Sequence, residues 1–379
     1  MTWFMRRLLC LISGCIAILL LCINVHAAGP AKIAKTNRSL WPYPINSPAA
    51  FDFASQMEML VFAEVFITKS TVNKKEDLIA FTGLKNVSVA SVTRWQSAVW
   101  AILTKNFNSI DTFHPDNFLK LTKPVLKSNI IETTEKLKHL MPEKLIPWYQ
   151  DSRRFYSYYL YEQMRLAALF PRITSEILKL DDSEVQGFGN QDKSFQLTFD
   201  DGPSIKKGNT DKLISVLNAY KVSGIFFVLG ENVKKRLKTD SQENLKTLYK
   251  DMKLGSHAMV HKSHAKYNLW QQSLDDTKKL IDLFSSGNAE PFYFRPPYGQ
   301  RTLAVVDHLK KSNSRVMLWN IDSQDWNKKI SAEETADRVT SLMLLWRSGI
   351  ILYHDVYSKA TTAMPIIINR LDGSGVNWL

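Results

Sequence analysis

Cysteine is nearly absent from this sequence, and the few cysteines lie at one end. All three, Cys10, Cys15 and Cys22, fall within the first 22 of 379 residues. The rest of the chain therefore has no disulfide framework, no thiolate nucleophile and no cysteine-based zinc site. Any metal must be bound by histidines and carboxylates, and any nucleophile must be a hydroxyl, a carboxylate or an activated water.

The N-terminal residues carry the features of an export signal. Two arginines precede an apolar run from Leu8 to Val25, and the small residues that follow place the cleavage site after Ala27. This order is typical of a signal peptide, here residues 1–27, and predicts a periplasmic or extracellular protein. The run is about long enough to span a bilayer, so an uncleaved membrane anchor is the alternative. Lipidation at Cys15 is disfavoured because the apolar run continues past it.

Acidic residues are too few to balance the basic ones, and the net charge is +13. Such a balance favours a polyanionic neighbourhood such as cell-wall polymer, lipopolysaccharide, a membrane surface or nucleic acid. The export signal and the lack of any RNA- or DNA-binding motif argue against nucleic acid. We therefore expect a polysaccharide partner, and association with the membrane or cell wall is compatible with the charge. The oligomeric state is left open.

The pattern of apolar residues changes from helical spacing to short β-rich runs near residue 190. Residues 28–46 are rich in proline, asparagine and serine and are interpreted as a linker. Residues 47–190 are interpreted as a helical domain because apolar residues recur there at spacings of three and four. The expected helices lie at 54–66, 91–104, 131–139 and 149–180. The aromatic stretch from Arg154 to Leu169 fits a buried helix face, with a glycan-stacking surface as the alternative.

Residues 191–379 alternate short β-rich runs with helical stretches, which argues for a parallel α/β architecture. Polar residues follow these runs one after another. Because the carboxyl ends of the strands of a β/α barrel meet on one face, we expect one cleft there. The runs are 195–199, 224–229, 255–260, 292–294, 316–321 and 349–353. The polar segments are TFDDGP (198–203), GSHAMVH (255–261), FRPPYG (294–299), WNIDSQDW (319–326) and ILYHD (351–355).

Asp201, His257 and His261 form a candidate metal site. Catalytic zinc commonly takes three protein ligands of the histidine and carboxylate types and leaves a position for water. The four-residue spacing of the histidines can place both side chains on one side of a helical turn. His264 is interpreted as a residue of the surface or rim.

The polar segments, in this order, resemble the motifs of the NodB-homology polysaccharide deacetylases, the family-4 carbohydrate esterases. The resemblance covers about residues 194 to 379 and leaves the helical half outside. It implies a distorted β/α barrel with fewer than eight strands. It also implies the metal ligands named above, with zinc as the expected ion and cobalt or manganese as alternatives. Ala258 departs from the family, which usually has serine or threonine after the first histidine.

The resemblance also implies the acid and base of a hydrolysis. Asp200 matches the general base, and Arg295 would pair with it and hold it in place. His354 matches the general acid, and Asp325 would hydrogen-bond to it and favour its charged form. Asp355 is interpreted as structural.

Three further residues match the substrate side of the family site. The backbone N–H of Tyr298, which follows two prolines, would donate to the oxyanion of the tetrahedral intermediate. Trp326 and Leu352 would line a small apolar pocket for the acetyl methyl group, with plain core packing as the alternative.

The predicted function is metal-dependent removal of acetyl groups from an exported glycan, with N-acetylglucosamine of peptidoglycan as the expected target. An acetylxylan-type O-deacetylase or a lipid-linked sugar deacetylase would use the same groups. A catalytically inactive glycan-binding module is disfavoured because the ligands, the base and the acid are all present.

Overall fold

The computed structural model describes residues 32–379, except 111–117, 120–127 and 286–290. Residues 33–379 form one compact unit. The predicted signal peptide at 1–27 lies outside the described residues.

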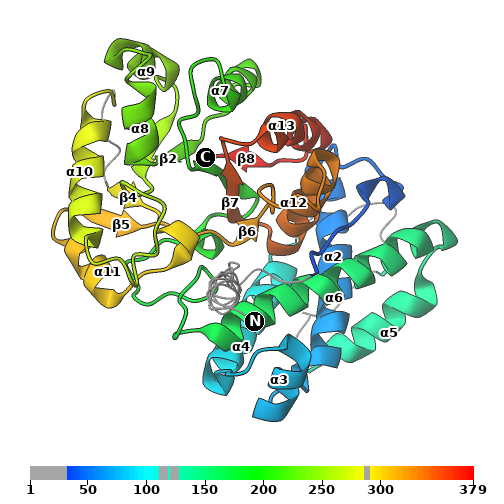
Figure 1. Ribbon diagram of the computed structural model, residues 1–379. Helices are drawn as coiled ribbons and strands as arrows, with labels where there is room; N and C mark the ends of the chain where they lie inside the picture. Colours follow the sequence, from blue (N-terminus) through cyan, green and yellow to red (C-terminus); the bar gives the residue numbers. More distant parts are fainter. Residues whose placement is uncertain (1–31, 111–117, 120–127, 286–290) are drawn as a thin grey trace, which may run out of the picture. The chain divides into compact units, whose positions relative to one another are not determined.

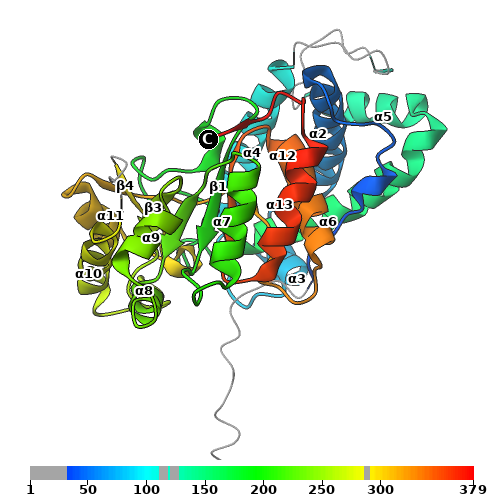
Figure 2. The ribbon, with the colours of Figure 1, turned by 90° about the horizontal axis from the view of Figure 1, so that it is seen from above.

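The second half of the chain is built on a curled parallel sheet (Figures 1 and 2). The strands follow the order β5-β4-β3-β2-β1-β7-β6, and β8 pairs with β1 beside this path. Every pair of neighbouring strands is parallel, which confirms the predicted barrel-like α/β fold. The strands are β1 (Ser194–Asp200), β2 (Ile225–Val228), β3 (Lys253–Ser256), β4 (Phe292–Phe294), β5 (Ser314–Val316), β6 (Ile321–Asp322), β7 (Gly349–His354) and β8 (Asn377–Trp378).

Helices surround the sheet on its outer side (Figure 1). They bury apolar stripes against the strands, as expected where parallel strands are joined by helical crossovers. These helices are α7 (Asn209–Ala219), α8 (Gly230–Arg236), α9 (Gln242–Leu248), α10 (Trp270–Asp282), α11 (Leu303–Lys310), α12 (Ala332–Trp346) and α13 (Ser358–Arg370), with the short 3-10 turn η4 (Pro297–Gly299).

The first half is helical, as predicted, and it packs directly on the outer helices of the sheet. Helix α2 is apolar nearly all round and is buried from Ala50 to Phe66, because it lies between α6 on one side and α12 on the other. One hydrophobic core therefore runs through both halves of the chain. The helices are α2 (Pro48–Ser70), α3 (Lys75–Thr82), α4 (Val89–Asn108), α5 (Ile130–Leu140) and α6 (Ile146–Leu169), with the 3-10 turns η1 (Arg38–Leu40), η2 (Glu143–Leu145) and η3 (Gly187–Gly189).

Residues 33–46, predicted to belong to a linker, lie against the helical half. Trp41 packs its ring edge-on against Trp148 at 4.8 Å. The backbone N–H of Ala34 donates to Glu162, and the hydroxyl of Thr36 donates to Asp151. A segment with little regular structure is thus tied down by hydrogen bonds and ring contacts along its length.

Several predicted elements end differently in the structure. The strand expected at 255–260 is β3, which stops at Ser256, so His257 and His261 lie in the loop after it and not on a strand or a helical turn. The helix expected at 149–180 stops at Leu169, because Pro171 disfavours helical backbone in the residue before it. The strand expected at 316–321 is divided into β5 and β6. The aromatic stretch of α6 is a buried helix face, since Phe155, Tyr156 and Tyr159 are almost fully buried.

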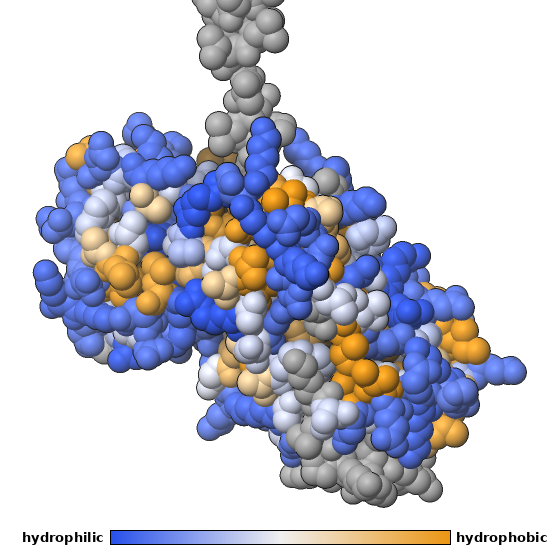
Figure 3. Space-filling view, turned by 90° about the horizontal axis from the view of Figure 1, so that it is seen from below, coloured by the Kyte–Doolittle hydropathy of each residue, from blue (hydrophilic) through white to orange (hydrophobic). Residues whose placement is uncertain are grey.

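The surface offers several small apolar patches on the face shown in Figure 3, separated by hydrophilic residues. Among the described residues, the large exposed apolar side chains are spread over many elements, from Ile131 on α5 to Ile205 after β1 and Leu303 on α11. Within the described part of the chain, no helix combines the length and hydropathy that crossing a membrane requires.

We predict that truncating Phe62 on α2 destabilises both halves together. Phe62 is fully buried and contacts the rings of Phe66, Tyr156 and Trp346, so Phe62→Ala removes packing on both sides of the shared core. The expected loss is about 3–5 kcal/mol of unfolding free energy in one transition, measured by urea denaturation. Ile131→Ala, at a side chain 58% exposed, is the control and should change stability by about 0.5 kcal/mol or less. A second, unshifted transition would show that the sheet unfolds independently of α2.

Candidate active site

The ends of β1 and β7 bring the proposed base and acid together. Asp200 and His354 occupy paired positions at the carboxyl ends of these adjacent parallel strands. Gly202 then lets the chain turn, because a Cβ atom there would lie 2.0 Å from the carboxylate of Asp355. Asp355 itself accepts a hydrogen bond from the hydroxyl of Thr210 and lies directly against Gly202 of this turn. These contacts fit its predicted structural role.

Asp201, His257 and His261 come together at the same edge of the sheet. Their ligand atoms all lie within 4.8 Å of one another. The Nε2 atoms of His257 and His261 lie 3.5 and 3.6 Å from Oδ1 of Asp201. Asp201 and Ala258 both have positive φ angles, 79° and 73°, which non-glycine residues adopt at a cost and which recur at functional sites.

The chemistry of these three side chains fits a divalent metal ion. The Nδ1 atom of His257 lies 2.7 Å from the carbonyl oxygen of Arg295, an arrangement that places the proton on Nδ1 and leaves Nε2 free as a ligand. Burial lowers the pKa of both His257 and His261, so both rings favour the neutral form that binds metal. The Oδ1 atom of Asp201 is buried and has no hydrogen-bond partner among the described residues, as a ligand oxygen awaiting a cation would be.

Arg295, the residue after β4, holds Asp200 from inside the barrel. Its guanidinium is fully buried and donates to Asp200 Oδ1 at 3.0 Å and to the hydroxyl of Thr198 at 2.7 Å. Burial raises the pKa of Asp200 to about 6, although the charge of Arg295 opposes the rise. A carboxylate with this pKa is ionised at neutral pH and still basic enough to take a proton.

His354 is paired with Asp325, which follows β6. The Nδ1 atom of His354 lies 2.7 Å from Asp325 Oδ1, and the backbone N–H of His354 donates to Asp325 Oδ2. Burial disfavours the charged ring, but the Asp325 carboxylate outweighs it and raises the pKa of His354 to about 10. The pair therefore keeps His354 protonated at neutral pH, the form that a general acid requires.

The residues predicted for the substrate side lie around these groups. Tyr298, in η4, has a φ of 60° and is 49% exposed, and its ring meets that of His261 at 4.5 Å. Trp326 follows Asp325 and is partly exposed, whereas Leu352 lies two residues before His354 and is buried in the barrel interior. Their roles toward an oxyanion and an acetyl group stay predictions.

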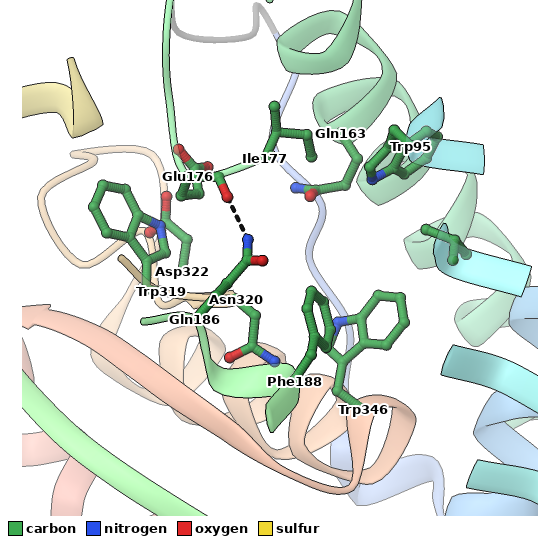
Figure 4. A pocket seen from close by; sticks show the side chains of 11 residues that line it. Trp95, Gln163, Glu176, Ile177, Gln186, Phe188, Trp319, Asn320, Asp322 and Trp346 are labelled. Atoms are coloured by element: carbon green, nitrogen blue, oxygen red, sulfur yellow. Dashed lines mark hydrogen bonds between the residues drawn. The ribbon is translucent and has the colours of Figure 1, made fainter. Parts of the chain in front are cut away.

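Sequence reasoning missed several residues of this region. His264 was expected at the surface or rim, but it is buried, and its ring lies 5.2 Å from that of Phe294 on β4. Glu176, from the segment after α6, lies with Asp322 and Trp319 around a cavity between the helical half and the sheet (Figure 4). Burial, followed by the charge of Asp322, raises the pKa of Glu176 to about 8. No local motif marks Glu176, since its partner in the cavity is distant in sequence.

Comparisons with known proteins show what this chain is similar to. Residues 189–317 match the family model described as polysaccharide deacetylase. A bifunctional xylanase/deacetylase of Pseudobutyrivibrio xylanivorans is 29% identical over 192 residues, 49% of this chain and 29% of that protein. A peptidoglycan-N-acetylglucosamine deacetylase of Bacillus cereus is 28% identical over 198 residues, 50% of this chain and 70% of that protein.

A solved structure, the Bc1960 peptidoglycan N-acetylglucosamine deacetylase, aligns with a TM-score of 0.43 and 25% identity over 52% of this chain and 89% of that one.

The resemblance to the polysaccharide deacetylases is thus confirmed over residues 189–317, about a third of the chain. The match includes Asp200, the three candidate metal ligands, Arg295 and Tyr298. It ends before Asp325 and His354, whose pairing is observed in the structure itself. The helical half lies almost entirely before the match, and the chain spans less than a third of the first of these relatives.

We predict that the purified protein binds one divalent metal ion through the Asp-His-His cluster. His257→Ala with His261→Ala should abolish binding, because a single carboxylate then remains at the site. Metal content by atomic emission spectroscopy and zinc affinity by calorimetry are the measurements. His308→Ala, a histidine outside the cluster and paired with Asp275, is the control and should leave both unchanged. Zinc retained at full stoichiometry in the double variant would exclude this site.

We predict that Asp325→Asn lowers the pKa of His354 from about 10 toward the ordinary histidine range, because the amide removes the charge that offsets burial. Titration of the His354 ring by NMR measures the change. Since a raised folded-state pKa favours folding at low pH and loses this effect as pH rises through it, the variant should also be less stable at neutral pH. An unchanged His354 titration would show that Asp325 does not set its charge.

Proposed function

We propose that this protein is an exported, metal-dependent deacetylase that removes N-acetyl groups from a glycan. The observation that carries the proposal is the meeting of Asp200 and His354 at the ends of β1 and β7, beside the cluster of Asp201, His257 and His261. A base that is ionised at neutral pH and an acid that is protonated at neutral pH stand on neighbouring strands. Amide hydrolysis needs this combination, because water must lose a proton and the leaving amine must gain one.

The residues divide the reaction among them. A divalent cation held by Asp201, His257 and His261 would supply Lewis acidity toward the acetyl carbonyl. Asp200 takes a proton from the attacking water, and Arg295 keeps the carboxylate oriented. As the carbon–nitrogen bond breaks, His354 gives its proton to the amine, and acetate leaves with the oxygen of the water.

The peptide N–H of Tyr298 is proposed as a donor to the oxyanion. Pro296 and Pro297 have no N–H groups of their own, so Tyr298 carries the first free donor after Arg295 in this loop. Removing one oxyanion donor in comparable sites costs about 10²–10³ in turnover, which makes the position of this loop important.

N-acetylglucosamine residues of peptidoglycan or a related glycan are the proposed substrate, and zinc is the proposed ion. The predicted export signal and the net charge of +13 support an enzyme that acts on an anionic wall or surface. The similarity to a peptidoglycan-N-acetylglucosamine deacetylase supports the same choice. An acetyl ester would use the same base, acid and donors, so O-deacetylation is the alternative that the assay must separate.

We predict that the purified enzyme releases acetate from peptidoglycan fragments or chitooligosaccharides, and that mass spectrometry finds a loss of about 42 Da per site, since an acetyl group is replaced by hydrogen. Asp200→Asn should lower turnover by about 10²-fold or more and keep the metal, because it removes the base and no ligand. Acetylxylan and lipid-linked sugars form the comparison panel. Acetate release from these alone would overturn the peptidoglycan assignment and leave the hydrolytic chemistry intact.

A further inference from the structure

The loop that carries Tyr298 is supported from behind by the segment Thr174–Glu184. This segment lies between α6 and β1 and precedes the part of the chain that matches the family. Gly299 lies so close to it that an added Cβ would come within 3.1 Å of the backbone of Ser175 and Glu176. The helical half of the chain thus ends in a segment whose backbone packs directly against the Tyr298 loop.

Arg301 joins the segment to the loop. Its side chain is buried and is held by the carboxylate of Glu184, with Nε–Oε1 and Nη2–Oε2 distances of 2.5 and 2.6 Å. Nη1 donates to the carbonyl oxygens of Ser175 and Gly299 at 2.7 and 2.9 Å, and Nη2 also donates to that of Leu178. The guanidinium therefore holds the residue next to Tyr298 and the supporting segment at the same time.

Thr174 adds two contacts to the backbone of the same residue. Its hydroxyl donates to the carbonyl oxygen of Arg301 and accepts from the N–H of Arg301, both at 2.9 Å. Glu184 in turn accepts from the backbone N–H of Leu180, which shapes the supporting segment itself. Both ends of the loop are thereby fixed, since Arg295 at its start is held inside the barrel.

The backbone of Tyr298 needs such support. Its φ of 60° lies in the left-handed region, which a non-glycine residue leaves unless its surroundings hold it there. The Tyr298 side chain is half exposed and contacts His261 on one side, so it does little to anchor the loop itself.

We propose that Thr174–Glu184, acting through Arg301, positions the Tyr298 N–H for catalysis, so that the helical half contributes to turnover as well as to stability. The proposal rests on the proposed deacetylase function. Thr174, Glu184 and Arg301 are positioning residues, because they act through the loop and not on the substrate.

The chain offers a matched control for a stabilising role alone. Asp52 of α2 is also a buried carboxylate of the helical half, and it pairs at 2.8 Å with a buried arginine of the sheet half, Arg347. Arg347 lies just before β7, at the amino ends of the strands, and so away from the loops that follow their carboxyl ends. Asp52→Asn therefore weakens a similar link between the halves without touching the Tyr298 loop.

The experiment compares Glu184→Gln, Thr174→Val and Asp52→Asn in the full chain, by kcat, KM, melting temperature, metal content and hydrogen exchange. Glu184→Gln should lower kcat about 10- to 100-fold, because the oxyanion donor is misplaced, with KM changed by about two-fold or less. Peptides covering 296–302 should exchange faster in Glu184→Gln and Thr174→Val, and metal content should stay the same. Asp52→Asn should lower the melting temperature and leave kcat and this exchange unchanged.

Two results would overturn the proposal. One is a kcat for Glu184→Gln equal to that of Asp52→Asn at a similar loss of melting temperature. The other is exchange at 296–302 that matches the wild type in both loop variants. If Glu184→Gln does not fold, Thr174→Val decides by the same measurements. If the wild type releases no acetate, the proposed function fails, while the exchange data still decide whether the segment holds the loop.

Discussion

The interior of the sheet is organised around a guanidinium from which water is excluded. A buried charge is costly unless it is paired and hydrogen-bonded, and each guanidinium nitrogen of Arg295 donates at least once, to Asp200, Thr198 or one of two backbone carbonyls. The carbonyls belong to Met317 and Leu318, just past β5, and the ring of Phe227 on β2 lies under the guanidinium at 4.2 Å. One side chain thus links the ends of several strands, and it also helps to fix the positions of Asp200 and His257, which Arg295 contacts through its guanidinium and its carbonyl oxygen.

The same requirement recurs at three places where the helical half meets the sheet half. Arg301, Arg338 and Arg347 are all buried, and each takes a carboxylate from residues before β1, respectively Glu184, Glu162 and Asp52. Removing one partner of such a pair leaves an uncompensated charge, which costs about 3–5 kcal/mol in comparable cases. These pairs and the apolar contacts of α2 join the first half of the chain to the sheet half, which carries the candidate site.

The sequence predicted those parts of the fold and of the candidate site that depend on short local segments. It did not predict the parts that depend on contacts between residues distant in sequence. The alternation of strand and helix, together with residues such as Asp201 and His257 at strand ends, predicts the parallel sheet and the candidate cluster. The support of the Tyr298 loop could not be predicted in this way, because Arg301 and Glu184 are 117 positions apart and neither stands in a recognisable motif. His264 was misjudged for a related reason, since its burial depends on contacts with residues distant in sequence, such as Phe294.

The way Arg301 is held limits how this catalytic unit can be moved between proteins. A fragment beginning at residue 191 would keep Arg301 and the loop but lose Glu184, Thr174 and the carbonyl oxygens of Ser175 and Leu178. A host scaffold would have to provide an acidic group and two backbone acceptors at the same place, or the guanidinium would turn outward to reach water. A transfer of this region to another scaffold should therefore include the segment that precedes it, Thr174–Glu184.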